Sequence, residues 1–214
     1  MRWELLGDVP DDEIRRVLSI ARRRTFARGE VVFHEHDPAD SLHLVAKGRF
    51  AVRITTPFGE SALLGLRGPG ESFGELALVS GREAVRSATV EALEPAETHA
   101  VYRREFDALR REHPGVGEVL VALLAQAVRR TNELLLDAYY APAETRVLRR
   151  LRDLAAAFPD GEVRLTQEDL ASLAGTSRAT VNRVLRDAER RGAVELRRGR
   201  TVVRDPDALA RRAR

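Results

Sequence analysis

Hydrophobic positions follow two different periods along this chain, and the change of period marks its organisation. Between residues 25 and 100 the apolar residues gather in short β-rich runs, such as residues 31–33, 42–45 and 50–54, which glycines separate. Many short strands with turn residues at near-regular spacing are typical of a β-sandwich, a barrel or a roll. This stretch is therefore predicted to form one β domain.

Apolar residues recur at helical spacing on both sides of the β-rich stretch. Residues 10–24 carry the apolar stripe of a short amphipathic helix. Residues 102–112 carry a second stripe, with Phe106 and Leu109 on its apolar side. Helices are therefore predicted before and after the β domain.

A much longer helix is predicted from Pro114 to about Tyr140, because proline suits the first turn of a helix. It carries two apolar stripes, and the first is expected to pack on the β domain: Leu120, Leu123, Ala127 and Leu134. The second has the four-and-three spacing of a coiled-coil seam: Val121, Leu124, Val128, Thr131, Leu135 and Ala138. Two apolar faces need two partners, so we predict a parallel homodimer through the second face. Burial of a single helix within one domain is the alternative.

The remainder of the chain has the pattern of a helix-turn-helix motif. Proline in residues 141–144 ends or kinks the long helix and marks a predicted hinge, and residues 145–158 predict a helix before a short strand at 163–165. Thr166 with an acid three residues later is a helix-start pattern, and Gly175 suits a sharp turn at the helix end. Ser177 can cap a second helix that runs to about Arg190. Helix, glycine-containing turn and helix favour binding of the DNA major groove.

The second helix supplies the candidate contacts to double-stranded DNA. Its exposed positions are predicted to be Arg178, Ala179, Asn182, Arg183 and Arg186. Arg178 and Arg183 lie roughly on one face and could bind guanine edges, the commonest specific contact. Gln167, Ser177 and Thr180 suit phosphate contacts or capping.

A basic hairpin follows and makes the predicted module winged. Residues 193–196 and 201–203 flank the sequence Arg-Arg-Gly-Arg, which adds Arg200 to the candidate DNA contacts. The alternative is an ordinary helical hairpin with a solvated arginine face.

Charge and composition narrow the choice of function. Residues 141–214 hold 17 arginines against 11 acidic residues, a net charge of +6, while the first 140 residues carry −3 of the chain's total of +3. A basic part attached to an acidic part fits a nucleic-acid-binding module joined to another domain. The absence of cysteine excludes disulfides, cysteine-ligated zinc and cysteine-held iron–sulfur clusters. No apolar run reaches membrane-spanning length and residues 1–8 lack a signal-peptide pattern, so we expect a cytoplasmic protein.

Histidines are the remaining candidate metal ligands. His34 and His36 alternate along a predicted strand, but the sequence clusters no third ligand with them. We interpret them as ordinary strand and turn residues, and no metal site is predicted.

Candidate ligand chemistry gathers in residues 70–78, GESFGELAL, here called the glycine-rich segment, and in residues 86–90, RSATV. Glycines four apart let the backbone turn tightly and approach a ligand, and backbone N–H groups in such a turn bind anions. Arg86 can donate a planar, charge-assisted fork to a phosphate, and Ser87 can add a hydroxyl donor. Glu75 is an acceptor and suits ligand hydroxyls. A phosphate beside a sugar hydroxyl fits this set, and a surface β-turn with an Arg–Glu pair is the alternative.

The two stretches together resemble the phosphate-binding cassette of cyclic-nucleotide-binding domains. From about residue 6 to about residue 212 the chain is similar to the CRP/FNR family of bacterial transcription regulators. The resemblance implies a jelly-roll-like β-roll that binds cyclic AMP through Gly74, Glu75, Leu76, Ala77, Arg86 and Ser87. It further implies that Thr131 and Asn132 contact the adenine across the dimer, and that RNA polymerase is a partner.

Three positions depart from the family pattern. His36 stands where the family usually has a glycine, and Asn132 stands in place of a serine. Ala179 replaces a glutamate that helps to read a cytosine, so an identical DNA half-site is not expected.

The predicted fold is α+β with three parts. These are a cyclic-nucleotide-binding β-roll domain at residues 1–113, a long dimerisation helix at 114–140 and a winged helix-turn-helix domain at 141–214. The predicted function is a dimeric regulator that couples cyclic AMP binding to binding of a pseudo-palindromic operator. The glycine-rich segment offers no nucleophile–base pair and no metal ligand set, so no catalytic residue is predicted and an enzyme is not expected.

Two alternative functions remain open. One is a regulator of the same family that binds DNA constitutively or senses another small molecule. Cyclic GMP is a lesser option as the ligand of the predicted nucleotide site. The other is a nucleotide-binding regulatory subunit that acts on a protein partner.

Overall fold

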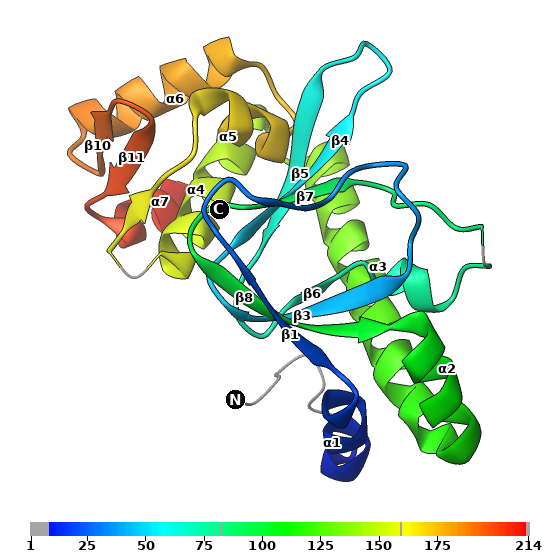
Figure 1. Ribbon diagram of the computed structural model, residues 1–214. Coiled ribbons are helices and arrows are strands. Elements are labelled where there is room, and N and C mark those ends of the chain that lie inside the picture. The colour runs from blue at the N-terminus through cyan, green and yellow to red at the C-terminus, as the bar shows by residue number, and fades with distance from the viewer. Residues whose placement is uncertain (1–8, 82, 159, 213–214) are drawn as a thin grey trace. The chain divides into compact units, whose positions relative to one another are not determined.

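The computed structural model describes residues 9–81, 83–158 and 160–212, so the predicted absence of a signal peptide in residues 1–8 lies outside the described residues. The chain divides into two compact units, residues 1–61 with 65–131 and residues 62–64 with 132–214. The first unit is rich in strands, and the second consists of helices and a small sheet (Figure 1). The predicted α+β class is confirmed.

Two four-stranded sheets build the β-rich unit, with the strand orders β1-β8-β3-β6 and β2-β7-β4-β5. The strands are β1 (Arg22–Phe26), β2 (Val31–Phe33), β3 (Ser41–Lys47), β4 (Phe50–Thr55), β5 (Ser61–Arg67), β6 (Ser72–Phe73), β7 (Thr89–Ala92) and β8 (Ala96–Tyr102). Early strands pair antiparallel with late ones, as β1 and β3 do with β8 and as β2 and β4 do with β7. The chain therefore wraps around itself as the predicted jelly-roll-like β-roll.

Strand β3 separates two hydrophobic cores because its side chains alternate between the faces of the sheet. Leu42 and Leu44 face a core that the helices cover, and Val45 faces the core between the two sheets. Phe50 and Phe73 lie in the core between the sheets, with their ring centroids 5.1 Å apart. Both faces of this sheet are thus buried.

A histidine is built into the core between the sheets. The imidazole of His43 is 4% exposed and stacks on the ring of Phe73 at a centroid distance of 5.0 Å. Its Nδ1 lies 3.0 Å from the Thr98 hydroxyl. Burial lowers the pKa of His43 from 6.5 to about 3, and the charges of Arg86 and Arg24 add to the effect.

Four helical segments cover the outer face of the first sheet: α1 (Asp11–Ser19), α2 (Arg103–Glu112), η3 (Pro114–Val116) and the first part of α3 (Gly117–Tyr140). Phe106 of α2 is fully buried in this core. The prediction of one helix over residues 10–24 is wrong at its end, because α1 stops at Ser19 and residues 22–26 form β1. Pairing of these residues with residues 96–100 of β8 explains the strand.

The long helix α3 has one covered and one uncovered apolar face within the described residues. Leu120 and Leu123 are buried against the β-rich unit, as predicted. Val121 and Val128 are each 59% exposed and Leu135 is 47% exposed, at the seven-residue spacing of the second stripe. Leu124 of the same stripe packs against the helix-covered core, so the part of the stripe that stays uncovered within a single described chain is Val121, Val128 and Leu135.

The second unit contains the predicted helix-turn-helix. Its helices are α4 (Ala143–Ala157), α5 (Gln167–Ala174), α6 (Arg178–Arg190) and α7 (Pro206–Arg212). Thr166 forms a capping box with Asp169 at the start of α5, and Gly175 ends α5 with φ of 57°. The hydroxyl of Ser177 accepts a hydrogen bond from the Thr180 N–H at 3.2 Å and caps α6. All three predicted helix signals are confirmed.

A hairpin completes this unit and is called the wing here (residues 194–203). It consists of β10 (Val194–Arg197) and β11 (Arg200–Val203), and β9 (Glu162–Val163) pairs with β11 on the other side. Arg197 and Arg200 face each other at the last paired position, and Gly199 takes φ of 72° in the two-residue tip. The predicted strand at 163–165 lies at 162–163 instead.

An arginine in α4 joins the end of the long helix to the helix-turn-helix. Arg146 donates from Nη1 to the carbonyl of Ala141 at 2.7 Å. Its Nε and Nη2 donate to the carbonyls of Ala174 and Gly175, at 2.7 Å and 2.9 Å. These are carbonyls at helix C-termini, which lack partners within their own helices.

The turn that contains His36 packs directly against residue 86. His36 adopts φ of 71°, the left-handed conformation that glycine adopts without cost. Its N–H donates to the carbonyl of Arg86 at 2.9 Å, and the Arg86 N–H donates to the carbonyl of Asp37 at 2.8 Å. The departure from glycine at this position therefore leaves the glycine-type backbone in place.

The buried imidazole predicts a loss of stability in mild acid. As the pH falls below about 6.5, the unfolded chain takes up a proton that folded His43 resists until about pH 3, so protonation favours unfolding. This single group is expected to lower the free energy of unfolding by about 1–2 kcal/mol between about pH 7 and pH 5. Denaturant unfolding of His43→Gln should show a smaller loss, whereas the exposed control His34→Gln should behave as the wild type. Equal pH dependence in all three proteins would contradict the prediction.

The positive φ of His36 leads to a second prediction about stability. His36→Val should lower the free energy of unfolding by about 1–2 kcal/mol, because a β-branched side chain clashes with the backbone at positive φ. His36→Gly should be at least as stable as the wild type. Urea unfolding measures both, with His34→Val as the control outside the left-handed position. A His36→Val protein of unchanged stability would argue against a strained turn.

Candidate functional site

The glycine-rich segment forms a sharp turn and a single helical turn. Strand β6 ends at Phe73, Gly74 takes φ of 78° and ψ of 17°, and the 3₁₀ helix η2 (Glu75–Leu78) follows. The first N–H groups of such a helix have no partner inside it. The backbone at Gly74 to Leu76 therefore presents donors at the point where the chain turns.

The guanidinium of Arg86 is held beside this turn. Nη1 donates to the Ser41 carbonyl at 2.6 Å, and Nη2 donates to the Ser41 hydroxyl at 2.8 Å and to Asp40 Oδ1 at 3.0 Å. The ring of Phe33 lies against the guanidinium, with Cζ 3.9 Å from the ring centroid. Phe33 and residues 40–41, which lie about 45 or more positions before Arg86, thus fix its orientation.

Gly74 and Arg86 are in direct contact, which explains why the turn needs a glycine. A Cβ on Gly74 would lie 2.8 Å from Arg86 Nη1 and 2.9 Å from the Ser41 carbonyl oxygen. Contacts of this length do not occur at real Cβ atoms, and the positive φ independently disfavours a side chain. The structure therefore brings together two residues that the sequence predicted for one ligand site.

Arg86 carries its charge in a poorly solvated place. Its side chain is 4% exposed, and its Nε is buried without a hydrogen-bond partner among the described residues. Burial lowers the pKa of Arg86 from its ordinary value of 12.5, and the carboxylate of Asp40 opposes that effect. A buried cation with a spare donor is suited to bind an anion, because pairing offsets the cost of removing the charge from water.

The other residues predicted to bind the effector follow Gly74 or Arg86 in the chain and differ in how far they are exposed to solvent. Ala77 is buried in η2, Glu75 is half-buried, and Leu76 and Ser87 are exposed. Glu75 lies in the electrostatic field of Arg67, whose pKa falls to about 10 through burial and the charge of Arg130, against the opposing charges of Glu71 and Glu75. Glu75 is thus an acceptor in a region that also holds two arginines.

Arg103 was not predicted from the sequence, yet it braces the site. Its Nε donates to the carbonyl of Ala77 at 2.5 Å, Nη1 to that of Gly81 at 2.7 Å and Nη2 to that of Ala39 at 2.9 Å. Ala39 directly precedes the two residues that hold Arg86. Arg103 therefore ties η2 and the support of Arg86 to the first turn of α2.

The long helix contacts the glycine-rich segment through Arg130. Its Nη1 donates to Glu71 Oε1 at 2.7 Å and its Nη2 to the Leu66 carbonyl at 3.1 Å. Thr131 and Asn132 follow and are both exposed, and the Thr131 hydroxyl donates to the Ala127 carbonyl at 3.0 Å. Their predicted contact with a ligand across a dimer stays a prediction.

On α6 the arginines of the last turns form ion pairs, whereas those of the first turns do not within the described residues. Arg186 pairs with Glu189 at 3.1 Å, and Arg190 pairs with Asp187 at 3.2 Å. Arg178 and Arg183 are exposed and have no ion pair among the described residues. The two arginines predicted to read bases are thus available for an external partner.

Other predicted DNA contacts already have partners inside the unit. The side-chain amide of Asn182 donates to Gln167 Oε1 at 3.0 Å, and the Ser177 and Thr180 hydroxyls lie 3.0 Å apart. The first pair links the two helices of the motif, and the second closes the α6 cap. The remaining side-chain N–H groups of Gln167 and Asn182, and one of the two hydroxyl protons, can still donate to a phosphate oxygen.

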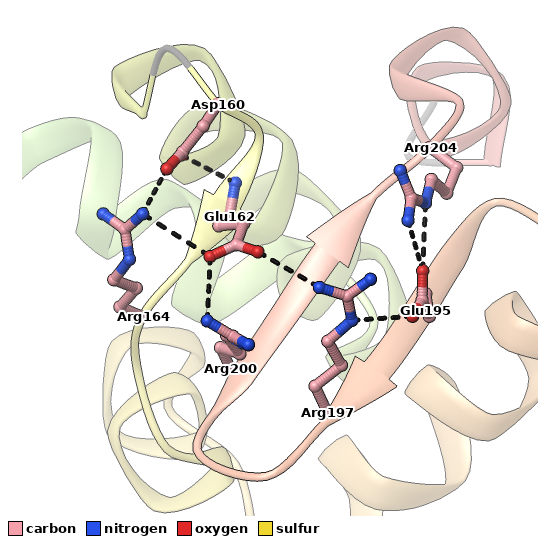
Figure 2. Close-up of polar contacts among 7 residues, drawn as sticks. All are labelled: Asp160, Glu162, Arg164, Glu195, Arg197, Arg200 and Arg204. Atoms are coloured by element: carbon pink, nitrogen blue, oxygen red, sulfur yellow. Dashed lines mark hydrogen bonds and ion pairs between the residues drawn. The ribbon is translucent and has the colours of Figure 1, made fainter.

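Arg200, the predicted DNA contact in the wing, is paired with a carboxylate. Its Nη1 lies 3.1 Å from Glu162 Oε2 of β9, and Arg197 Nη1 lies 3.3 Å from Glu162 Oε1 (Figure 2). Arg198 at the tip is exposed and has no such pair within the described residues. Glu162 therefore neutralises part of the positive charge that the sequence gives to the wing.

The described ranges hold neither a candidate metal cluster nor a helix that could cross a membrane. Residues 9–81, 83–158 and 160–212 contain no cluster of three His, Cys, Asp or Glu side chains arranged to hold a metal ion. Within the same ranges no helix has both the length and the apolar character needed to span a bilayer.

Family models match both units of the chain. Residues 23–113 match the cyclic nucleotide-binding domain, and this range contains the glycine-rich segment and Arg86. Residues 145–212 match the Crp-like helix-turn-helix domain, which contains α5, α6 and the wing.

Known proteins are similar to this chain over most of their own length. The CRP-like cAMP-activated global transcriptional regulator of Mycobacterium tuberculosis is 37% identical over 199 residues, 88% of this chain and 87% of that protein. The cyclic AMP receptor protein of Thermus thermophilus is 36% identical over 205 residues, 96% of this chain and 94% of that protein. The crystal structure of the Thermus thermophilus catabolite activator protein matches with a TM-score of 0.55 and 35% identity, over 98% of this chain and 97% of that chain.

The fold, the placement of Arg86 beside the Gly74 turn and the capped helix-turn-helix agree with these similarities. Members of this group are regulators and not enzymes, as the sequence predicted. The chain belongs to the CRP/FNR family of transcription regulators, with a cyclic-nucleotide-binding domain followed by a Crp-like helix-turn-helix.

Proposed function

We propose that this regulator is a cytoplasmic homodimer that binds cyclic AMP beside Arg86 and, when cyclic AMP is bound, binds a pseudo-palindromic DNA operator through α6. The observation that carries the proposal is the buried guanidinium of Arg86 in contact with Gly74, with an unpartnered Nε. RNA polymerase is the expected partner at the promoter.

A cyclic phosphodiester suits the charge of this site. It carries one negative charge, and the site offers one buried arginine whose charge Asp40 shares in part. Arg103 lies nearby, but three backbone carbonyls occupy its donors. The half-buried carboxylate of Glu75 is placed at the start of η2, where it can accept from a ribose hydroxyl.

We favour cyclic AMP over cyclic GMP as the proposed ligand on two grounds. Ser87 after the arginine resembles the cyclic AMP pattern of the family, and relatives that are 36–37% identical are named as cyclic AMP-activated or cyclic AMP-receptor proteins. Thr131 and Asn132 are exposed on α3, where their hydroxyl and amide could bind an adenine edge.

The uncovered face of α3 supports the dimer. Val121, Val128 and Leu135 repeat every seven residues and remain exposed in the chain alone. Water contact with such a stripe is unfavourable, and a second copy of the same helix would cover it in coiled-coil fashion. The nucleotide would then lie next to the helix that relates the two subunits.

Coupling between ligand and DNA requires two arrangements of the segment around residues 141–143. In the structure Asp137 binds Arg149 at 2.7 Å and Arg150 at 2.9 Å, and Arg146 binds the Ala141 carbonyl. These contacts span the predicted hinge and define one arrangement. Cyclic AMP can shift DNA binding only by its difference in affinity for the two arrangements.

The phosphate assignment predicts the effect of replacing Arg86. Arg86→Lys should weaken cyclic AMP binding about 10- to 100-fold, because one ammonium replaces a fork held in place by Ser41 and Asp40. Arg86→Ala should abolish the response to nucleotide. Isothermal titration of nucleotide-stripped protein with cyclic AMP, and separately with cyclic GMP, measures both.

Arg28→Ala is the matched control, because Arg28 is an exposed arginine of the same unit. Wild-type affinity in Arg86→Lys would disprove the role of Arg86. If the wild type binds neither nucleotide while it still binds DNA, the protein is a constitutive regulator or one that senses another small molecule.

The DNA assignment predicts a difference between arginines on one helix. Arg178→Ala and Arg183→Ala should each cost about 1–3 kcal/mol of binding free energy on the preferred sequence and relax its base preference. Arg190→Ala should cost much less, because that arginine pairs with Asp187 in the last turn. Selection from a random duplex library, followed by fluorescence anisotropy, supplies both readouts. Equal losses at Arg178 and Arg190 would argue against α6 as the reading helix.

A further inference from the structure

The arginines of the wing are held by carboxylates of their own sheet. Figure 2 shows Glu162 of β9 between Arg164, Arg197 and Arg200, and Glu195 of β10 between Arg197 and Arg204. Asp160 pairs with Arg164 at the edge of the group. We call these seven residues the wing charge network.

Glu162 is the centre of this network. Its Oε2 lies 3.1 Å from Arg200 and 3.4 Å from Arg164, and its Oε1 lies 3.3 Å from Arg197. Its side chain is 19% exposed, whereas those of the three arginines are 38–44% exposed. The carboxylate is therefore less exposed to solvent than the guanidinium groups that pair with it.

The second carboxylate is also committed to arginines at neutral pH. Hydrogen bonds from Arg197 and Arg204 lower the pKa of Glu195 to about 2. Arg197 donates to both carboxylates, with 2.6 Å to Glu195 Oε1. Arg200, in contrast, has Glu162 as its carboxylate partner among the described residues.

A DNA phosphate would meet these arginines in competition with Glu162. Phosphate and carboxylate accept hydrogen bonds from the same guanidinium N–H groups, and the two anions repel each other. Contacts to phosphate release bound counterions, so their number sets the salt dependence of DNA affinity. A carboxylate that already neutralises Arg197 and Arg200 reduces both the affinity and the salt dependence that the wing can contribute.

We propose that Glu162 sets the strength of the contact between the wing and DNA by pairing with Arg197 and Arg200 from the adjacent strand β9. This inference rests on the proposed binding of DNA by the second unit. Because phosphates carry no sequence information, Glu162 weakens binding to operator and to random DNA by the same factor. It therefore limits non-specific binding by a strongly arginine-rich module without changing which bases α6 reads.

The test uses the full-length dimer and a variant that removes charge but keeps shape. Glu162→Gln should bind a short random-sequence duplex about three- to tenfold more tightly at low salt. The slope of log affinity against log salt concentration should be steeper by the amount that about one additional phosphate contact contributes, or more. Asp153→Asn is the matched control, because it removes one negative charge from the same unit and Asp153 pairs with Arg152 of its own helix.

Further variants separate charge competition from altered folding. Glu162→Gln combined with Arg200→Ala should lose most of the gain in affinity and slope. Glu195→Gln should change both in the same direction as Glu162→Gln, through Arg197. Thermal unfolding of each variant shows whether the wing remains folded.

The outcomes are distinct. If Glu162→Gln and Asp153→Asn bind DNA with the same affinity and slope, or if Glu162→Gln binds more weakly while it stays folded, the inference is overturned. Loss of preference between selected and random duplexes in Glu162→Gln would also overturn it. If the wild type binds no duplex at any salt, with or without cyclic AMP, the proposed DNA function fails first and the role of Glu162 fails with it.

Discussion

The buried guanidinium of Arg86 is the interaction on which the candidate ligand site depends. A charge in this position must be matched from several directions, and the fold provides a carbonyl and a hydroxyl from Ser41, a carboxylate from Asp40 and the face of Phe33. The close approach of Gly74 is possible only because no Cβ intervenes. The jelly-roll topology is what brings these separate segments to one point, since β2, the start of β3 and the loop before β7 converge there.

Arginine also joins segments at two other places by the same chemistry. Arg103 binds carbonyls of Ala77, Gly81 and Ala39, and Arg146 binds those of Ala141, Ala174 and Gly175. Each guanidinium supplies several donors in fixed geometry, so one side chain can satisfy three backbone acceptors. The high arginine content is therefore partly structural, and it is not a count of contacts to DNA.

Local signals in the sequence predicted local structure well. Thr166, Gly175 and Ser177 were identified as caps and a turn, because capping depends on neighbours within three residues. Gly74 and Arg86 were assigned to one ligand site from the chemistry of their two segments and from the family resemblance. The supports of Arg86 at Asp40 and Ser41 were not predicted, since they lie 45 or more positions away and carry no spacing signal. The same limit applies to Arg200, whose partner Glu162 is 38 positions away, and to residues 22–24, whose strand state depends on β8.

The contacts of Asp137 and Arg146 give the end of the long helix an unusual mechanical character. The ring of Pro142 already restricts the backbone of this joint, and two ion pairs and a hydrogen bond to the Ala141 carbonyl span it as well. Each exposed or half-exposed pair is worth about 1 kcal/mol or less, so the joint can open at modest cost. The end of α3 is therefore held to α4 by several separate contacts, each of which costs little to break, so a small difference in free energy is enough to exchange them for others.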